Sequence, residues 1–332
     1  MICNMVGYRI AYNLGTLLSM DDVLLCSTLA DKKYNVDSIW VPESWGREAF
    51  ASLGALSQKT KKVKLGSSII SIYARTPATV AMAATTLDLL SNNRTIIGLG
   101  ASTPAIVENW HGLKFEQPLA RMREYIECLK LMVKADEVNY KGKFFTIKNF
   151  KLLYKPPRQK IPIFIAAINK NMISLATELA DGILLYLRPI DELKETVSAI
   201  KSNTNRHNKE FEIACVFIAA ISNTQPQKAR ERAAKTLAFY ISVGRYYNKF
   251  LSENGFSDQV NHITTRYTSE GLDAAAKNVS DKMLDSLTIS GTCEDCIKSL
   301  ERFVSCGITL PIIQINPVGD AESSIRTMLS TF

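Results

Sequence analysis

The 332-residue sequence has no apolar run of the roughly 20 residues that a helix needs to cross a bilayer. Its amino terminus also lacks a basic segment followed by an apolar stretch, which is the pattern of a secretory signal peptide. The seven cysteines are odd in number and scattered, so they do not form the disulfide framework that small secreted domains need. We therefore expect a cytoplasmic protein with reduced thiols and no membrane partner.

Concentrated charge of one sign is also missing, although the formal net charge is +8 and the pI is near 9.0. Basic residues occur only in short bursts, such as 59–64, where a helix is expected to end and a strand to begin. Dispersed charge provides no continuous stripe along which a nucleic-acid backbone could bind. We therefore expect no nucleic-acid partner, and a positive field that favours an anionic coenzyme or substrate.

No G-x-G-x-x-G turn follows the first expected strand, which argues against a doubly wound dinucleotide-binding sheet. Short apolar runs rich in β-branched residues instead alternate with longer segments of helical period, as in repeated βα units. This pattern predicts an α/β fold, a (β/α)₈ TIM barrel of eight parallel strands that are each followed by a helix. The expected strands are 6–10, 38–41, 64–70, 95–99, 161–166, 182–186, 212–219 and 310–315.

A barrel of this kind needs about 250 residues, so the chain has room for insertions. Residues 139–150 combine turn residues with aromatic and β-branched ones, and they predict a hairpin between the fourth helix and the fifth strand. A larger helical insertion is expected at about 222–305, between strands seven and eight, with helices at 227–251 and 271–287. Its turns are expected at Asn254-Gly255 and Ser290-Gly291. No internal repeat or Pro/Gly/Ser-rich linker divides the chain, so we expect one domain over residues 1–332.

The loops that leave the strands build the active site in barrel enzymes. Small residues at the exits 98–102 and 166–169 allow main-chain N–H groups to approach a phosphate, although close strand–helix packing would also explain them. Glu43 follows the strand 38–41 and can accept a hydrogen bond from a ring N–H, or act as an acid or base in a dry pocket. An exposed loop acid or a partner of Arg47 is the alternative interpretation of Glu43.

Other polar residues are expected to have structural roles. Cys293 and Cys296 form a lone C-x-x-C pair without a second pair or a nearby histidine, in the first turn of a helix capped by Thr292, so we expect no metal site. Asp88 and Arg94 flank the turn into the fourth strand, at the amino-terminal face of the expected barrel. A structural ion pair is expected there rather than catalysis.

Seven segments of the chain carry a family resemblance when they are taken in order. They are IWVPESWGREAF (39–50), LGSSIISIYARTP (65–77), TLDLLSNNRTIIGLGAS (86–102), ENWHG (108–112), PLARMREYIECLK (118–130), IPIFIAAINKNM (161–172) and LADGIL (179–184). Together they resemble the bacterial luciferase-like superfamily, and within it the branch that uses the deazaflavin coenzyme F420, typified by methylenetetrahydromethanopterin reductase.

The resemblance implies an oxidoreductase that transfers a hydride between coenzyme F420 and a small substrate, such as a methylene-tetrahydropterin, an alcohol or a small carbonyl compound. It implies a non-prolyl cis peptide at Ser68-Ile69 that supports the deazaflavin ring from behind. Glu43 falls where relatives contact this ring, and Glu43, Ser44 and His111 are the catalytic candidates. The coenzyme tail is expected at Gly100, Ala101, Ser102, Thr103, Ala167, Ile168, Asn169 and Lys170, and the substrate at Tyr12, Asn13, Tyr73, Trp110 and Arg188.

The chain also departs from its relatives. Ser44 and Thr103 stand where enzymes that oxidise sugar phosphates have histidine and glutamate, and no acidic residue stands near Tyr12 and Asn13, where the reductase type has one. Two alternatives therefore remain open. One is a monooxygenase of the same superfamily that uses flavin mononucleotide (FMN), and the other is a non-catalytic coenzyme-binding barrel. Family habit further implies a homodimer or a higher homo-oligomer.

Overall fold

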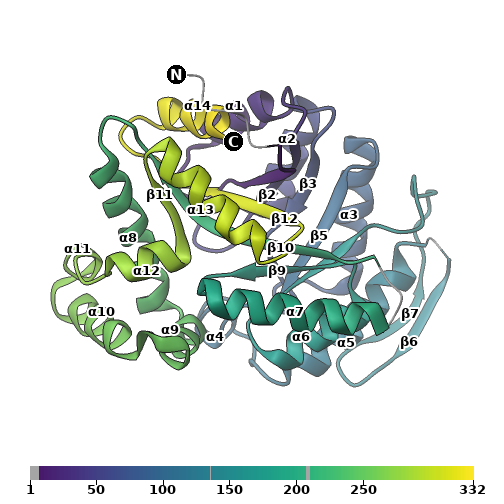
Figure 1. Ribbon diagram of the computed structural model, residues 1–332. Helices are drawn as coiled ribbons and strands as arrows, with labels where there is room; N and C mark the ends of the chain where they lie inside the picture. Colours follow the sequence, from purple (N-terminus) through teal and green to yellow (C-terminus); the bar gives the residue numbers. More distant parts are fainter. Residues whose placement is uncertain (1–6, 135, 207–209) are drawn as a thin grey trace. The chain divides into compact units, whose positions relative to one another are not determined.

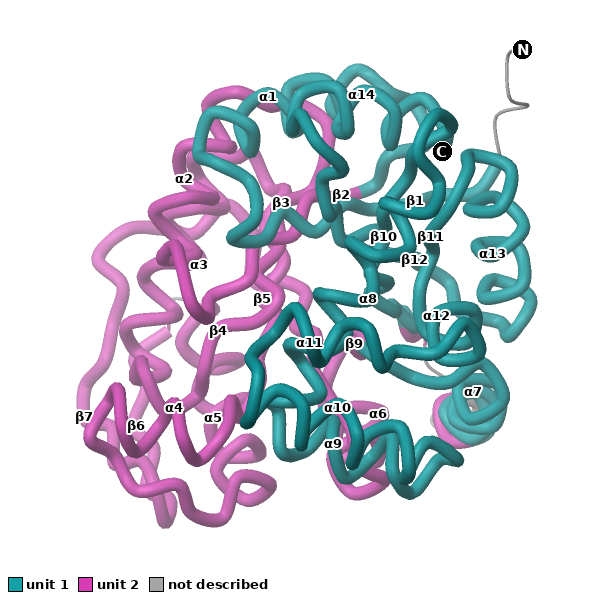
Figure 2. Tube along the Cα trace, turned by 90° about the vertical axis from the view of Figure 1, so that its left-hand side faces the viewer, with its two compact units in different colours: residues 1–37, 185–202, 212–332 teal, residues 38–184, 203–211 magenta. Residues whose placement is uncertain are grey.

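The computed structural model of the protein describes residues 7–134, 136–206 and 210–332 (Figure 1). The chain groups into two compact units (Figure 2). Unit 1 comprises Met1–Asp37, Leu185–Ser202 and Glu212–Phe332, and unit 2 comprises Ser38–Leu184 and Asn203–Phe211. Within the described residues, no helix is both long and apolar enough to cross a membrane. The six cysteines in the described part are all free thiols, as expected.

Unit 2 is built on a parallel sheet in the strand order β2, β3, β5, β8, β9, with β4 paired to β5. Every residue of β5 is buried, as expected for a parallel strand covered on both faces. The strands are β2 (Val36–Val41), β3 (Lys64–Ser67), β4 (Ile70–Ser71), β5 (Thr95–Gly100), β8 (Ile163–Ala166) and β9 (Gly182–Tyr186).

The helices of unit 2 follow its strands in chain order. Several begin with a side chain that accepts a backbone N–H, such as Thr76 before α3, where Pro77 supplies a preset first helical residue. The antiparallel pair β6 (Val138–Lys141) and β7 (Thr146–Phe150) confirms the predicted hairpin. The helices are α2 (Ala49–Lys59), α3 (Pro77–Ser91), α4 (Pro104–Asn109), α5 (Pro118–Met132) and α6 (Lys170–Leu179).

Unit 1 has a parallel sheet in the order β11, β10, β12, β1. Its strands are β1 (Ile10–Asn13), β10 (Glu212–Ile221), β11 (Thr288–Gly291) and β12 (Leu310–Ile315). Four further helices are α1 (Met20–Ala30), α7 (Ile190–Arg206), which begins in this unit, α13 (Cys293–Ser305) and α14 (Ala321–Thr331).

The predicted helical insertion of unit 1 lies between β10 and β12. Small and apolar side chains of α8, among them Ala233, Leu237 and Ile241, pack into a core with later helices of the insertion. The elements are α8 (Pro226–Val243), α9 (Arg245–Leu251), the π-helical turn η1 (Ser252–Phe256), α10 (Ser257–Glu270), α11 (Leu272–Ala276) and α12 (Asp281–Leu287).

The first strand was predicted too early in the chain. It spans Ile10–Asn13, and Val6 lies outside the described residues. The strand extends to Asn13 because its register with β12 continues to the pair Asn13 and Gln314. Tyr12 and Asn13 therefore lie inside the strand and not in the loop after it.

Three details of the insertion were also wrong. Ser290-Gly291 is not a turn, because both residues pair with the end of β10 as part of β11. The helix expected at 227–251 is interrupted at Gly244, where α8 ends and α9 begins. The helix expected at 271–287 is likewise two short helices. The turn at Asn254-Gly255 is confirmed, since Gly255 has a φ of 88° inside η1.

The ion pair expected between Asp88 and Arg94 is wrong in its partners. The Asp88 carboxylate is buried and accepts hydrogen bonds from Nε (2.9 Å) and Nη2 (2.8 Å) of Arg158. Arg94 instead donates to the backbone carbonyls of Thr60 and Val63, in the turn before β3. Both residues still have the structural role that was expected of them.

Candidate functional site

The third strand of the chain is interrupted by a bulge at residues 67–69. The ladder between β3 and β5 ends at the pair Gly66 and Ile96, and pairing resumes with Ile70 and Leu99. Four residue steps on one strand thus oppose three on the other, which is the single extra residue of a β-bulge. The peptide bond between Ser68 and Ile69 inside the bulge is cis, as the resemblance implied.

Hydrogen bonds hold this bulge from both neighbouring strands. The Ser67 hydroxyl donates to the Gly98 carbonyl (3.0 Å) and accepts from the Gly98 N–H (2.9 Å). On the other side, the Ser68 N–H donates to the Val41 carbonyl at 2.9 Å. The Ile69 carbonyl accepts a longer hydrogen bond, 3.4 Å, from the N–H of Glu43. The bulge is therefore part of the sheet and not a free loop.

The glycines at the end of β5 make room for the bulge. A Cβ added to Gly98 would lie 1.9 Å from the Ser67 carbonyl oxygen, and one added to Gly100 would lie 2.6 Å from side-chain atoms of Ile69. Close packing, the alternative interpretation of these small residues, is thus what the described structure contains at both positions. At Gly100 the neighbour is the same Ile69 that the resemblance places against the coenzyme ring.

The carboxylate of Glu43 forms a two-pronged ion pair with Arg75. Nη1 of Arg75 donates to Oε2 of Glu43, and Nη2 donates to Oε1 at 2.6 Å. Oε1 also accepts the backbone N–H of Ala49 at 3.2 Å. The hydrogen bond with Glu43 is the chief reason why the pKa of Arg75 is raised. The basic partner that the structure shows for Glu43 is therefore Arg75, to which the sequence assigned no role.

Two residues at the candidate tail-binding exits cap helices with their side chains. Oγ1 of Thr103 accepts the backbone N–H of Ile106 at the start of α4, and Oδ1 of Asn169 accepts that of Met172 at the start of α6. Beside Thr103, Ser102 has a φ of 62°, in the left-handed region. At the second exit, Ala167 donates its N–H to the Leu184 carbonyl at 3.3 Å, and Ile168 and Lys170 flank the cap.

The aromatic candidates of unit 2 differ in exposure. Tyr73 is buried, and its hydroxyl donates to the Glu116 carbonyl at 2.8 Å. Trp110 is 53% exposed and meets the half-exposed Trp45 edge-on, with ring centroids 6.1 Å apart. His111 is exposed and Ser44 is half-buried. The two tryptophans thus form an open aromatic surface between the loop after β2 and the C-terminal end of α4.

The candidate substrate residues of unit 1 are more deeply buried. Tyr12 is inaccessible to solvent, and burial together with the nearby Cys26 thiol raises its pKa. Asn13 is also buried. Arg188 is 2% exposed, donates through Nη1 to Glu192 and to Thr196 (3.1 Å), and lies over the Phe250 ring at 4.8 Å. Arg188 therefore already participates in an internal ion pair.

Unit 1 also contains a cluster of aromatic rings and one amide that was not predicted from the sequence. The Tyr186 hydroxyl, at the end of β9, donates to Oε1 of Gln314 at 2.7 Å. The ring of Tyr186 lies edge-on to Tyr240 and to Tyr247, with centroids 5.1 and 5.6 Å away. Tyr186 is the last residue of the predicted strand 182–186, but Tyr240 and Tyr247 lie on insertion helices, and no spacing rule shows which side chains these helices face.

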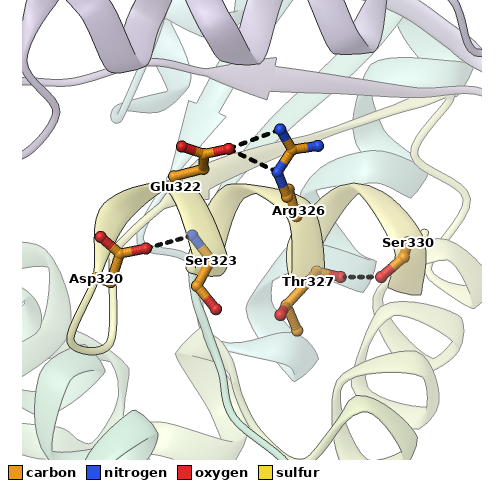
Figure 3. A pocket seen from close by; sticks show the side chains of 6 residues that line it. All are labelled: Asp320, Glu322, Ser323, Arg326, Thr327 and Ser330. Atoms are coloured by element: carbon orange, nitrogen blue, oxygen red, sulfur yellow. Dashed lines mark hydrogen bonds and ion pairs between the residues drawn. The ribbon is translucent and has the colours of Figure 1, made fainter.

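A surface hollow runs along α14, and its side chains bond mainly to one another (Figure 3). Glu322 accepts two hydrogen bonds from Arg326, and Asp320 accepts the backbone N–H of Ser323. None of the candidate site residues lines this hollow. In the described residues, we also find no group of three or more His, Cys, Asp or Glu side chains that could hold a metal ion.

Comparisons with known proteins show which proteins this chain resembles. The profile of the luciferase-like monooxygenase family matches residues 23–310. A protein of Mycobacterium tuberculosis named as a coenzyme F420-dependent oxidoreductase is 30% identical over 86% of this chain and 88% of its own length. The 5,10-methylenetetrahydromethanopterin reductase of Archaeoglobus fulgidus is 30% identical over 87% of this chain and 88% of its own.

The structure of the coenzyme F420-dependent tetrahydromethanopterin reductase from Methanopyrus kandleri superposes with a TM-score of 0.84. It covers 97% of both chains at 20% identity. This likeness confirms the predicted fold, a barrel of eight parallel strands with surrounding helices. Since the family profile spans most of the sequence, the chain belongs to the luciferase-like monooxygenase family.

Proposed function

We propose that the protein is a coenzyme F420-dependent oxidoreductase, which transfers a hydride between this deazaflavin and a small organic substrate. The observation that carries the proposal is the 30% identity, over nearly the whole chain, to two proteins named for this coenzyme or for a reaction of this enzyme branch. We further propose that it acts in the cytoplasm as a homodimer or a larger homo-oligomer, as the resemblance implies.

The residues of unit 2 at the bulge and just after β2 suit a planar ring. The bulge presents the half-buried side chain of Ile69, and Gly100 has no Cβ that would displace it. The Glu43 carboxylate is held two residues after β2 and can accept a ring N–H. The bound deazaflavin would supply the hydride chemistry, and the protein would orient the ring and exclude water.

In this proposal, Ile69 supports the ring and Glu43 accepts a hydrogen bond from its edge. The loops at the start of α4 and α6 hold the tail with their residues Gly100 to Thr103 and Ala167 to Lys170. Glu43, Ser44 and His111 are the proposed catalytic residues. The hydroxyl of Tyr73 is already donated to a backbone carbonyl, so Tyr73 would contribute its ring to the substrate site. Trp110, Tyr12, Asn13 and Arg188 complete the proposed substrate residues.

The test is a fluorescence titration of the purified apo-protein with coenzyme F420 and, in parallel, with FMN. We expect micromolar binding of coenzyme F420 and weaker binding of FMN. Micromolar binding of FMN alone, with oxygen consumed during turnover, would refute the proposal and support a monooxygenase. Tight binding of coenzyme F420 without turnover on any reduced pterin, alcohol or carbonyl compound would indicate a non-catalytic coenzyme-binding barrel.

A further inference from the structure

The ion pair between Glu43 and Arg75 limits what the Glu43 carboxylate can do. We propose that Arg75 is a positioning residue that fixes Glu43 as a hydrogen-bond acceptor for the coenzyme ring, so that Glu43 takes no part in proton transfer. This inference rests on the proposed function, because it assumes that Glu43 contacts the coenzyme. It removes Glu43 from the three catalytic candidates and adds Arg75 to the residues that organise the site.

The hydrogen bonds of Glu43 leave one acceptor position open. A carboxylate offers about four lone-pair positions to donors. Arg75 occupies one on each oxygen, and the Ala49 N–H occupies a second one on Oε1. The remaining position is on Oε2. A proton on Oε1 would face two N–H donors, so the only place for a proton is the position that a ring N–H would need.

The Arg75 guanidinium is itself held in place by neighbouring elements. Its Nη2 also donates to Glu48, whose other oxygen accepts the Ala51 N–H at 2.5 Å as the cap of α2. The guanidinium lies 5.8 Å from the centroid of the Phe50 ring. From α5, the Tyr125 hydroxyl donates to the backbone carbonyl of Arg75 at 3.1 Å. The direction of the fork is therefore set before any ligand arrives.

Burial and geometry make this pair stronger than an ordinary surface ion pair. The side chains of Arg75 and Glu43 are 17% and 18% exposed. A planar fork bound to both oxygens fixes the plane of the carboxylate, which a lysine ammonium in the same place would not do. Arg75 forms ion pairs with both Glu43 and Glu48, so this group of three side chains carries one net negative charge. A neutral or electron-poor ring N–H is a suitable hydrogen-bond donor for a group with this net negative charge.

The test is a double-mutant cycle on coenzyme binding with Glu43→Gln, Arg75→Gln and the double variant. We expect each single change to raise the Kd for coenzyme F420 about tenfold. The Kd of the double variant should be no higher than that of either single variant, since the two residues act as one unit. We expect kcat at saturating coenzyme to change by less than about threefold, because the effect lies in binding. Arg75→Lys, which keeps the charge without the planar fork, should restore only part of the affinity.

Arg123→Gln is the matched control. Arg123 forms a two-pronged pair with Glu178, 2.6 Å on each prong, on the helices α5 and α6. Arg123 contacts none of the candidate site residues, so the Kd of the Arg123→Gln protein for the coenzyme should equal that of the wild type. Circular dichroism and urea unfolding check that each variant is folded, and if Arg75→Gln does not fold, the cycle is run with Arg75→Lys.

Two results would overturn the role of Arg75. One is a large fall in kcat for Glu43→Gln with an unchanged Kd, because this would make Glu43 a proton-transfer residue. The other is a Kd for Arg75→Gln that equals that of Arg123→Gln. The wild-type titration tests the proposed function separately. If the wild type binds FMN and not coenzyme F420, the proposed function fails, and the same cycle measured with FMN still decides the role of Arg75.

Discussion

Replacing the two glycines at the end of β5 tests how the bulge is supported. In Gly98→Ala, the new methyl group would lie 1.9 Å from the Ser67 carbonyl oxygen, where real Cβ contacts are essentially never under 3.0 Å. That oxygen belongs to the backbone, so the strand must move by about 1 Å or more, and overpacking of this kind costs about 3 kcal/mol. The two hydrogen bonds of the Ser67 hydroxyl to Gly98 would weaken as well.

Gly100→Ala should behave differently, because the new methyl group meets a side chain. Its nearest neighbours are the Cδ1 and Cγ1 atoms of Ile69, both at 2.6 Å, and Ile69 is only half-buried. The Ile69 side chain can rotate away at a cost of about 1 kcal/mol in unfolding free energy. Since Ile69 is the proposed support of the ring, the rotated side chain should raise the Kd for coenzyme F420 about tenfold.

Gly54→Ala is the control for both substitutions. Gly54 lies inside α2 with nothing within 4 Å of an added Cβ. Alanine there should raise the unfolding free energy by about 0.5 to 1 kcal/mol through helix propensity, and leave coenzyme binding unchanged.

The assays are urea unfolding followed by circular dichroism, and the fluorescence titration with coenzyme F420. A Gly98→Ala protein as stable as the wild type would refute the packing argument. A Gly100→Ala protein that binds the coenzyme normally would refute the placement of Ile69 behind the ring. Equal losses of stability in both variants would show that the distinction between a backbone and a side-chain neighbour is wrong.

Two further predictions concern residues away from the site. Asp88→Asn should lower the free energy of unfolding in urea by about 2 kcal/mol or more, because Arg158 loses its ionised partner; unchanged stability would contradict a structural role. Burial raises the pKa of Cys26 to about 12 and raises that of Cys296 also, so both thiols stay protonated at pH 8. Maleimide labelling read by mass spectrometry should therefore modify the partly exposed Cys293 and Cys306 before Cys26 and Cys296, and fast labelling of Cys296 would contradict its burial.

The fold was predictable because buried parallel strands stand out in the sequence as short apolar runs. The strands at 182–186 and 310–315 match the prediction to the residue, since each is a short apolar run that ends at polar or turn residues. β11 was missed because Thr288–Gly291 is a four-residue strand that ends in glycine, and such a segment reads as a turn. Only its register with β10 reveals the strand, and pairing between distant segments is not written in local periodicity.

The site was predictable in its location and less so in its contacts. Strand exits can be found from the predicted strands, and Arg75 lies in the segment that follows the predicted strand 64–70. The bond from Arg75 to Glu43 joins residues 32 positions apart, and no spacing rule connects them. One signal could have suggested it: a basic and an acidic residue at the exits of two strands that are neighbours in the sheet.

Glu43 combines two supports of the proposed ring site in one residue. Its backbone N–H bonds to the Ile69 carbonyl of the bulge, and its side chain is held by Arg75. The first contact depends only on where β2 ends, whereas the second depends on the charge of the side chain. Glu43→Gln therefore removes the charge and leaves the main-chain contact in place. Because a main-chain hydrogen bond between two neighbouring strand ends joins the surface behind the ring to the acceptor at its edge, their spacing is set by the strands, and the side chains only adjust it.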